Sequence, residues 1–121
     1  MQNGTSVELS YSLNNGLNNY TSLNTPVIYQ GNMNQFLLQL AQQINTNSAL
    51  HGFYASIDGG CIHIRSIKAT FWNHPPLNME IEIIDAAQQA TLLLNPFSIC
   101  EPTNQDAERE LCGVYCFNEN P

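Results

Sequence analysis

The sequence predicts a single α+β domain, a mainly antiparallel β-sheet of about five to six strands with one principal amphipathic helix packed on it. Apolar residues recur at helical spacing between residues 33 and 44. Apolar and polar residues alternate in three short segments, 7–13, 53–57 and 79–83, as in half-buried strands. Gly59-Gly60 follows the second segment and indicates the turn of a hairpin. A length of 121 residues suits one domain.

The first half of the chain begins with strand 7–13, and the polar, turn-rich segment 14–24 is expected to be a surface loop. Residues 25–30 are expected to form a short edge strand that starts near Pro26. The helix is predicted at about 32–45 with an asparagine cap, and hairpin 53–65 follows. A bulge is expected near Ser66, where the alternation slips. The apolar stripe of the helix comprises Met33, Phe36, Leu37, Leu40, Ala41 and Ile44.

The second half contains a proline-rich connection, 69–76, followed by strand 79–83. Residues 85–89 are expected to form a turn or one helical turn, and residues 91–94 an interior strand or the end of one. From residue 98 the sequence becomes polar and acidic, and three of the four cysteines lie there. We therefore divide the chain into a core domain, 1–97, and a cysteine-containing C-terminal tail, 98–121, that packs on the core or on a partner.

The composition excludes some partners. Charged residues make up only 11% of the chain, against about 25% in average proteins. Sixteen asparagines and nine glutamines provide a neutral polar surface that suits a subunit packed in an assembly or a protein facing the outside. The net charge is −7 and the basic residues are Arg65, Lys68 and Arg109, so nucleic acid and anionic membranes are not expected partners. No apolar segment reaches the roughly 20 residues of a membrane helix, and no secretory signal is recognised.

The cysteines leave three interpretations open. A zinc site would need His51, His63 or His74 as further ligands, and only one Cys-x₃-Cys knuckle is present. Disulfides suit a protein that works outside a reducing cytosol, and the third possibility is free thiols packed in a core. Four cysteines allow three pairings, and the sequence does not choose among them. The possible disulfide residues are Cys61, Cys100, Cys112 and Cys116, and we expect neither a metal nor a cofactor.

Residues that could perform catalysis form no recognisable motif. No serine or cysteine near the three histidines has the sequence context of a nucleophile, so the histidines are expected at the surface. Glu80 and Glu82 fall on one face of a strand and are expected to be solvated or to contact a cation at a subunit interface. The sequence therefore predicts a protein that is not an enzyme.

Several residues are candidates for an interface. Phe71 and Trp72 form an aromatic pair that fits an anchor in a neighbouring subunit, a platform for a sugar or peptide, or simple core packing. Gln39 and Gln43 lie on the uncharged face of the predicted helix, and Tyr20 lies in the asparagine-rich loop. We therefore expect protein–protein contacts around these five residues.

The order of Tyr29–Gly31, helix 32–45, Gly52–Gly59 and Cys61–Ser66 resembles a strand–helix–hairpin module. That module is found in structural proteins of tailed phages and other viruses and in flagellar filament-associated proteins, although the cysteine-containing tail departs from the pattern. The resemblance implies a structural subunit of a viral (phage) particle, in a tail, baseplate or capsid, with other copies of itself and other virion subunits as partners. The alternative is a secreted or surface module, stabilised by disulfides, that binds a glycan or a peptide.

Overall fold

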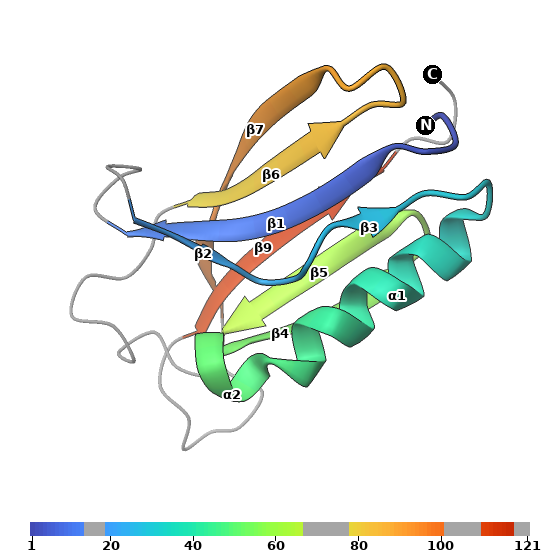
Figure 1. The fold of residues 1–121 in the computed structure, drawn as a ribbon. Coiled ribbons are helices and arrows are strands. Elements are labelled where there is room, and N and C mark those ends of the chain that lie inside the picture. Colours follow the sequence, from blue (N-terminus) through green and yellow to red (C-terminus); the bar gives the residue numbers. More distant parts are fainter. Residues whose placement is uncertain (14–18, 67–77, 101–109, 118–121) are drawn as a thin grey trace.

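The protein folds into two antiparallel sheets and one main helix (Figure 1). The computed structural model describes residues 1–13, 19–66, 78–100 and 110–117. This confirms the α+β class, with mainly antiparallel strands and one principal helix. The elements are β1 (Ser6–Leu13), β2 (Asn19–Ser22), β3 (Val27–Ile28), α1 (Met33–Thr46), α2 (Ser48–His51), β4 (Phe53–Asp58), β5 (Cys61–Ser66), β6 (Asn78–Ile84), β7 (Ala90–Pro96), β8 (Ser98–Cys100) and β9 (Glu110–Cys116).

The strands form two sheets rather than the single sheet of five to six strands that the sequence predicts. Sheet A has five strands, with β2, β1, β6 and β7 in that order and β3 also paired to β1. Sheet B has four strands in the order β4, β5, β9, β8. The prediction fails because β6 and β9 pair with strands far away in the sequence, which no local pattern reveals. Segment 98–121, expected to be a tail, supplies β8 and β9.

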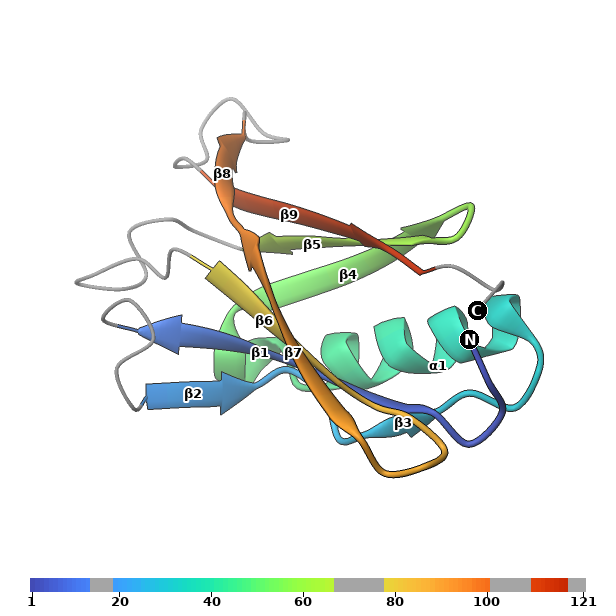
Figure 2. The ribbon, with the colours of Figure 1, turned by 90° about the horizontal axis from the view of Figure 1, so that it is seen from above.

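The two sheets face each other across one hydrophobic core (Figure 2). On one side, β7 and β8 are separated by Phe97 alone, so the chain passes directly from the edge of sheet A to the edge of sheet B. Helix α1 packs against β4 and β3 and covers the other side. The core is therefore enclosed by strands on two faces, by a crossing strand on a third and by a helix on a fourth.

Helix α1 follows its predicted pattern closely. All six residues of the apolar stripe are buried, and the Asn32 side chain accepts a hydrogen bond from the Gln35 backbone N–H at 3.0 Å. Gln43, predicted to face a neighbour, accepts from the Thr25 backbone N–H at 2.9 Å and so ties the helix to the segment before β3. No described helix is long and apolar enough to cross a membrane.

Hairpin β4–β5 is regular from Phe53↔Ser66 to Asp58↔Cys61, so the bulge expected near Ser66 is wrong. Ser66 is buried, and its hydroxyl accepts from the Leu111 backbone N–H at 2.8 Å. A polar residue thus occupies a core position because β9 supplies its partner. The expected surface loop 14–24 also contains an unpredicted strand, β2, which pairs with β1.

Three asparagine side chains act as substitutes for missing backbone partners. Asn24, which is buried, lies between β2 and β3, accepts from the Leu9 N–H at 2.8 Å and donates to the Val7 carbonyl at 3.2 Å. Asn45 of α1 bonds both backbone groups of Ala55 on edge strand β4, at 3.0 and 2.7 Å. Asn95 of β7 donates to the Val114 carbonyl of β9 at 2.9 Å. Each side chain completes a strand edge where no strand continues the sheet.

Candidate functional site

The four cysteines form two disulfides on sheet B. Cys61 of β5 bonds Cys116 of β9, its direct neighbour across the two strands. Cys100 of β8 bonds Cys112 of β9, which lies two residues along β9 from Glu110, the residue directly opposite Cys100. No described residues gather into a group of three or more metal-binding side chains. The cysteines therefore serve as covalent links among β5, β9 and β8.

Alternation along the strands decides which side chains of sheet B face outward. On β5, Ile62, Ile64 and Ser66 are buried, so the residues between them face away from the core. The same alternation operates on β4 and β9. We call the resulting surface the outer face of sheet B, and it is formed by Tyr54, Ser56, Asp58, Cys61, His63, Arg65, Cys112, Val114 and Cys116.

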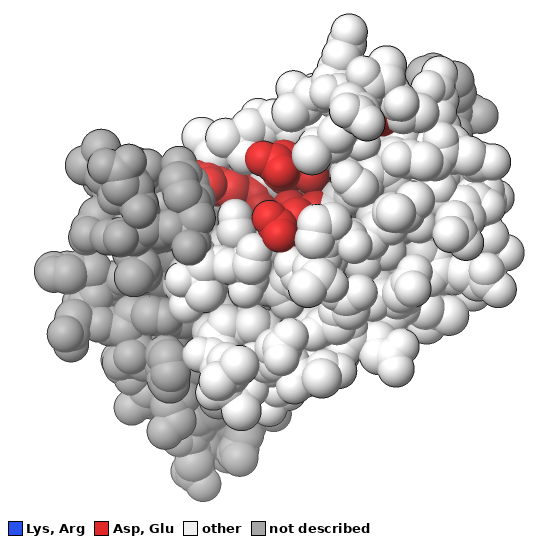
Figure 3. Space-filling view, viewed as in Figure 1, with Lys and Arg blue, Asp and Glu red and all other residues white. Residues whose placement is uncertain are grey.

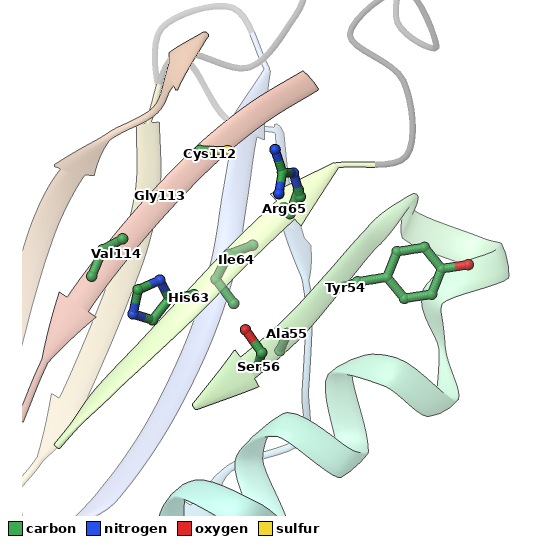
Figure 4. Close-up of a pocket in the computed structure, with 9 residues that line it drawn as sticks. All are labelled: Tyr54, Ala55, Ser56, His63, Ile64, Arg65, Cys112, Gly113 and Val114. Carbon is green, nitrogen blue, oxygen red and sulfur yellow. The ribbon is translucent and has the colours of Figure 1, made fainter. Parts of the chain in front are cut away.

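This outer face carries a hollow of about 240 Å³ (Figure 4). One row across three neighbouring strands consists of Ser56, His63 and Val114, and the next row consists of Tyr54, Arg65 and Cys112. We call this site the outer hollow. Its lining comprises Tyr54, Ala55, Ser56, His63, Ile64, Arg65, Cys112, Gly113 and Val114.

The chemistry of the outer hollow combines one cation with polar and apolar groups. Arg65 is the only lysine or arginine in the described ranges, and its Nη2 donates to the Cys100 sulfur at 3.6 Å. Tyr54 is 49% exposed and Val114 is 45% exposed, so both present apolar surface to a ligand. Within the described part, no hydrogen bond joins Ser56 to its neighbour His63. The arrangement offers a guanidinium, an imidazole, a hydroxyl and an aromatic ring on a rigid sheet.

Gly113 lines the outer hollow, and its inward side lies against the hydrophobic core. Its position faces inward on β9, and a Cβ atom there would lie 3.1 Å from the Phe97 ring. Phe97 in turn stacks on Phe53, with ring centroids 5.4 Å apart. A side chain at residue 113 would require the ring of Phe97, the residue that joins β7 to β8, to shift by a few tenths of an ångström, so glycine allows the two sheets to meet closely here.

A second polar feature lies on the outer face of sheet A. Glu8 of β1 pairs directly with Glu82 of β6, and Glu80 is two residues away on the same face. Figure 3 shows acidic side chains gathered in one hollowed region of the face seen in Figure 1. Glu80 is 3% exposed, so the expectation that it is solvated is wrong, and burial raises the pKa of its carboxyl group. This acidic region and the cationic outer hollow belong to different sheets.

His51 is buried rather than at the surface, which corrects the sequence prediction. It ends α2 with 2% of its surface exposed, and its Nδ1 accepts from the Phe53 backbone N–H at 3.1 Å. Burial lowers the pKa of His51, while the backbone of Ile44 and Leu23 acts more weakly in the opposite direction. His51 is thus a structural residue that joins α2 to β4. His63 does face outward, in the outer hollow.

We expect the protein to lose stability as the pH falls through about 6.5, the ordinary pKa of histidine. The unfolded chain takes up a proton there that the folded His51 resists, so acid favours unfolding. His51→Asn keeps an acceptor for the Phe53 N–H and should flatten the loss. Urea unfolding at pH 7.5, 6.5 and 5.5 measures the free energy of unfolding of the wild type and of His51→Asn. The two proteins are compared at each pH because the raised pKa of Glu80, present in both, changes stability in the opposite sense. An unchanged slope in His51→Asn, or a slope equally flattened by His63→Asn, would contradict the assignment.

The structure places the predicted interface residues in different parts of the molecule. Phe71 and Trp72 lie outside the described residues, as does His74. Tyr20 lies in β2, opposite Ser12, and Gln39 is exposed on α1. The side-chain oxygen of Gln43 already accepts a hydrogen bond from the Thr25 backbone N–H. The structure does not bring these residues together into one surface.

Sequence reasoning missed the outer hollow. The alternation of 53–57 and 61–65 placed Tyr54, Ser56, His63 and Arg65 on one face of a hairpin, which is the signal that could have found them. The remaining lining residues come from β9, which pairs with β5. Cys61 and Cys116 are direct partners in this pairing although they are 55 residues apart in the sequence, so local patterns do not predict it. Comparison with known protein families, curated proteins and solved structures finds no match for this chain.

Proposed function

We propose that this protein is a disulfide-stabilised recognition module that works outside a reducing cytosol and binds an acidic glycan in the outer hollow. The observation that carries the proposal is the position of the two disulfides, which both join strands of the sheet that forms the hollow. Disulfides persist in oxidising environments and are uncommon in cytosolic proteins. They also fix β5, β8 and β9 relative to one another, so the ligand meets a surface that is already ordered.

The charge distribution supports an acidic ligand. The chain has a net charge of −7, yet the only cationic side chain in the described ranges lies in the outer hollow. A carboxylate or sulfate would find there the positive charge of the Arg65 guanidinium. Tyr54, directly across from Arg65, offers a ring face against which a sugar packs. A hollow of about 240 Å³ suits one or two sugar units rather than a larger molecule.

An array of uronic-acid, sialic-acid, sulfated and neutral glycans tests this function. We expect binding to be restricted to acidic glycans and to fall at least about tenfold in Arg65→Gln, because a charge-assisted pair is lost. Glu82→Gln, which alters a charge on sheet A, is the matched control and should bind like the wild type. Equal binding by Arg65→Gln, a preference for neutral glycans or no glycan binding at all would refute the proposal.

A structural subunit of a viral (phage) particle is the second candidate function, and the surface beside α1 favours it. A groove runs between α1 and β4, and none of its lining residues carries a charge. Leu38 on its rim is 51% exposed, and Gln42 and Asn45 are neutral polar neighbours. Such a surface is easily desolvated against another copy or another virion subunit. In this function the disulfides would stabilise a particle outside the cell rather than a ligand site.

A further inference from the structure

Strand β7 lies at one edge of sheet A. The hairpin that joins β7 to β6 shows which backbone groups of β7 point away from β6. The Asp85 backbone N–H donates to the Gln89 carbonyl at 3.0 Å, which makes this pair a hydrogen-bonded one. Hydrogen-bonded and non-hydrogen-bonded pairs alternate along an antiparallel ladder. The backbone groups of Ala90, Leu92 and Leu94 therefore point away from β6, and no described strand pairs with them.

Asparagine side chains complete the edges of β4 and β1, whereas no described strand pairs with this edge of β7. Asn45 caps β4 and Asn24 fills the gap beside β1, each with two hydrogen bonds to backbone groups. Natural proteins also protect edges with charged side chains, yet residues 86–96 contain none. Pro96 ends the open segment, because it has no N–H to donate.

The side chains beside this edge form two parallel rows on the outer face of sheet A. Leu94 is 62% exposed and lies opposite Glu80, and Leu92 is 56% exposed and lies opposite Glu82. Glu8 follows on β1, directly opposite Glu82. An apolar row at the edge is thus bordered by an acidic row one strand further in.

We propose that β7 accepts an additional strand from a partner protein, and that this strand alternates apolar residues with lysine or arginine. Its backbone would bond Ala90, Leu92 and Leu94 and extend sheet A by one strand. Its basic side chains would lie over the leucines with their methylene stems and reach the accessible carboxylates of Glu82 and Glu8 beyond. A second copy of β7 would supply leucines but no cation and would leave the acidic row unpaired. This surface is separate from the outer hollow and does not depend on the function proposed for it.

A capped decapeptide of alternating valine and lysine, labelled with a fluorophore, is the probe for this site. We expect it to bind the wild-type protein and to slow hydrogen exchange of the Ala90, Leu92 and Leu94 amides. The same peptide N-methylated on one lysine and the neighbouring valine should lose at least about tenfold in affinity, because the ladder then lacks a donor whichever way the added strand runs. A peptide of alternating valine and glutamate should not bind.

Two protein variants localise the binding. Leu92→Pro removes an outward-pointing N–H without removing a bond to β6 and should weaken binding at least about tenfold. Glu82→Gln keeps the backbone intact and should weaken binding about threefold at low salt, whereas Asp58→Asn on sheet B should have no effect. Equal binding of the N-methylated peptide, unchanged binding by Glu82→Gln, or a wild-type dimer that Leu94→Lys dissociates would overturn the proposal.

Discussion

Replacing Cys61 and Cys116 together with serine is expected to lower the free energy of unfolding by about 4 kcal/mol. The bridge spans 55 residues, and loop-closure entropy makes a bridge more stabilising as the loop it closes lengthens. It also joins β5 to β9 directly, so its loss frees the two central strands of sheet B from each other in the unfolded chain. Urea unfolding with a common slope measures the difference.

The second bridge provides the internal comparison for this result. Cys100 and Cys112 are separated by only 12 residues, so the double serine variant is expected to lose about 3 kcal/mol. Because nesting changes the effective length of the longer loop only slightly, the four-serine variant should lose close to the sum of the two. A larger loss at Cys100–Cys112 than at Cys61–Cys116 would show that loop length does not control stabilisation here.

Asn24→Ala is expected to destabilise the fold by about 2 kcal/mol, a large effect for one asparagine. The substitution leaves the buried Leu9 N–H without its partner, and such a group costs about 1–3 kcal/mol. The Val7 carbonyl loses the Asn24 donor but keeps its ladder pairing with Val27 of β3. Asn34→Ala is the matched control, because Asn34 is exposed on α1 and alanine favours a helix. Equal unfolding midpoints for the two variants would contradict the role assigned to Asn24.

The variant Asn24→Asp provides a pH-dependent version of the same experiment. A protonated carboxyl group has one acceptor oxygen and one donor, so it can serve Leu9 and Val7 as the amide does. An ionised carboxylate has no donor and is costly to bury. The stability difference from the wild type should therefore shrink as the pH falls.

The asparagine content has a physical explanation that composition alone did not provide. From the sequence, the amides suggested a neutral surface for contacts with neighbours. Asn24, Asn45 and Asn95 instead complete strand edges inside the fold, and Asn32 caps α1. An asparagine side chain presents the same donor and acceptor as a peptide group. It can therefore replace a strand where the sheet has a gap.

Local patterns predicted the local structure and little of its assembly. Helix 33–46 and hairpin 53–66 follow from periodicity and turn residues, because their stabilising contacts are close in sequence. The division into two sheets depends on β6 beside β1 and β9 beside β5, which are distant pairings. The burial of His51 and Glu80 was not predicted, because polar residues are expected at the surface unless the surrounding tertiary structure is known. The outward positions of Tyr54, His63 and Arg65 could be predicted, but the hollow they share could not.

The position of β9 within sheet B sets the order in which this protein can fold. β9 lies between β5 and β8, yet it comes last in the sequence among the nine strands that the structure describes. Hairpin β4–β5 must therefore wait with one edge open until residues 110–116 have left the ribosome. Folds dominated by such late, distant contacts complete slowly. A nascent chain of this protein is expected to need protection of that edge until its final strand arrives.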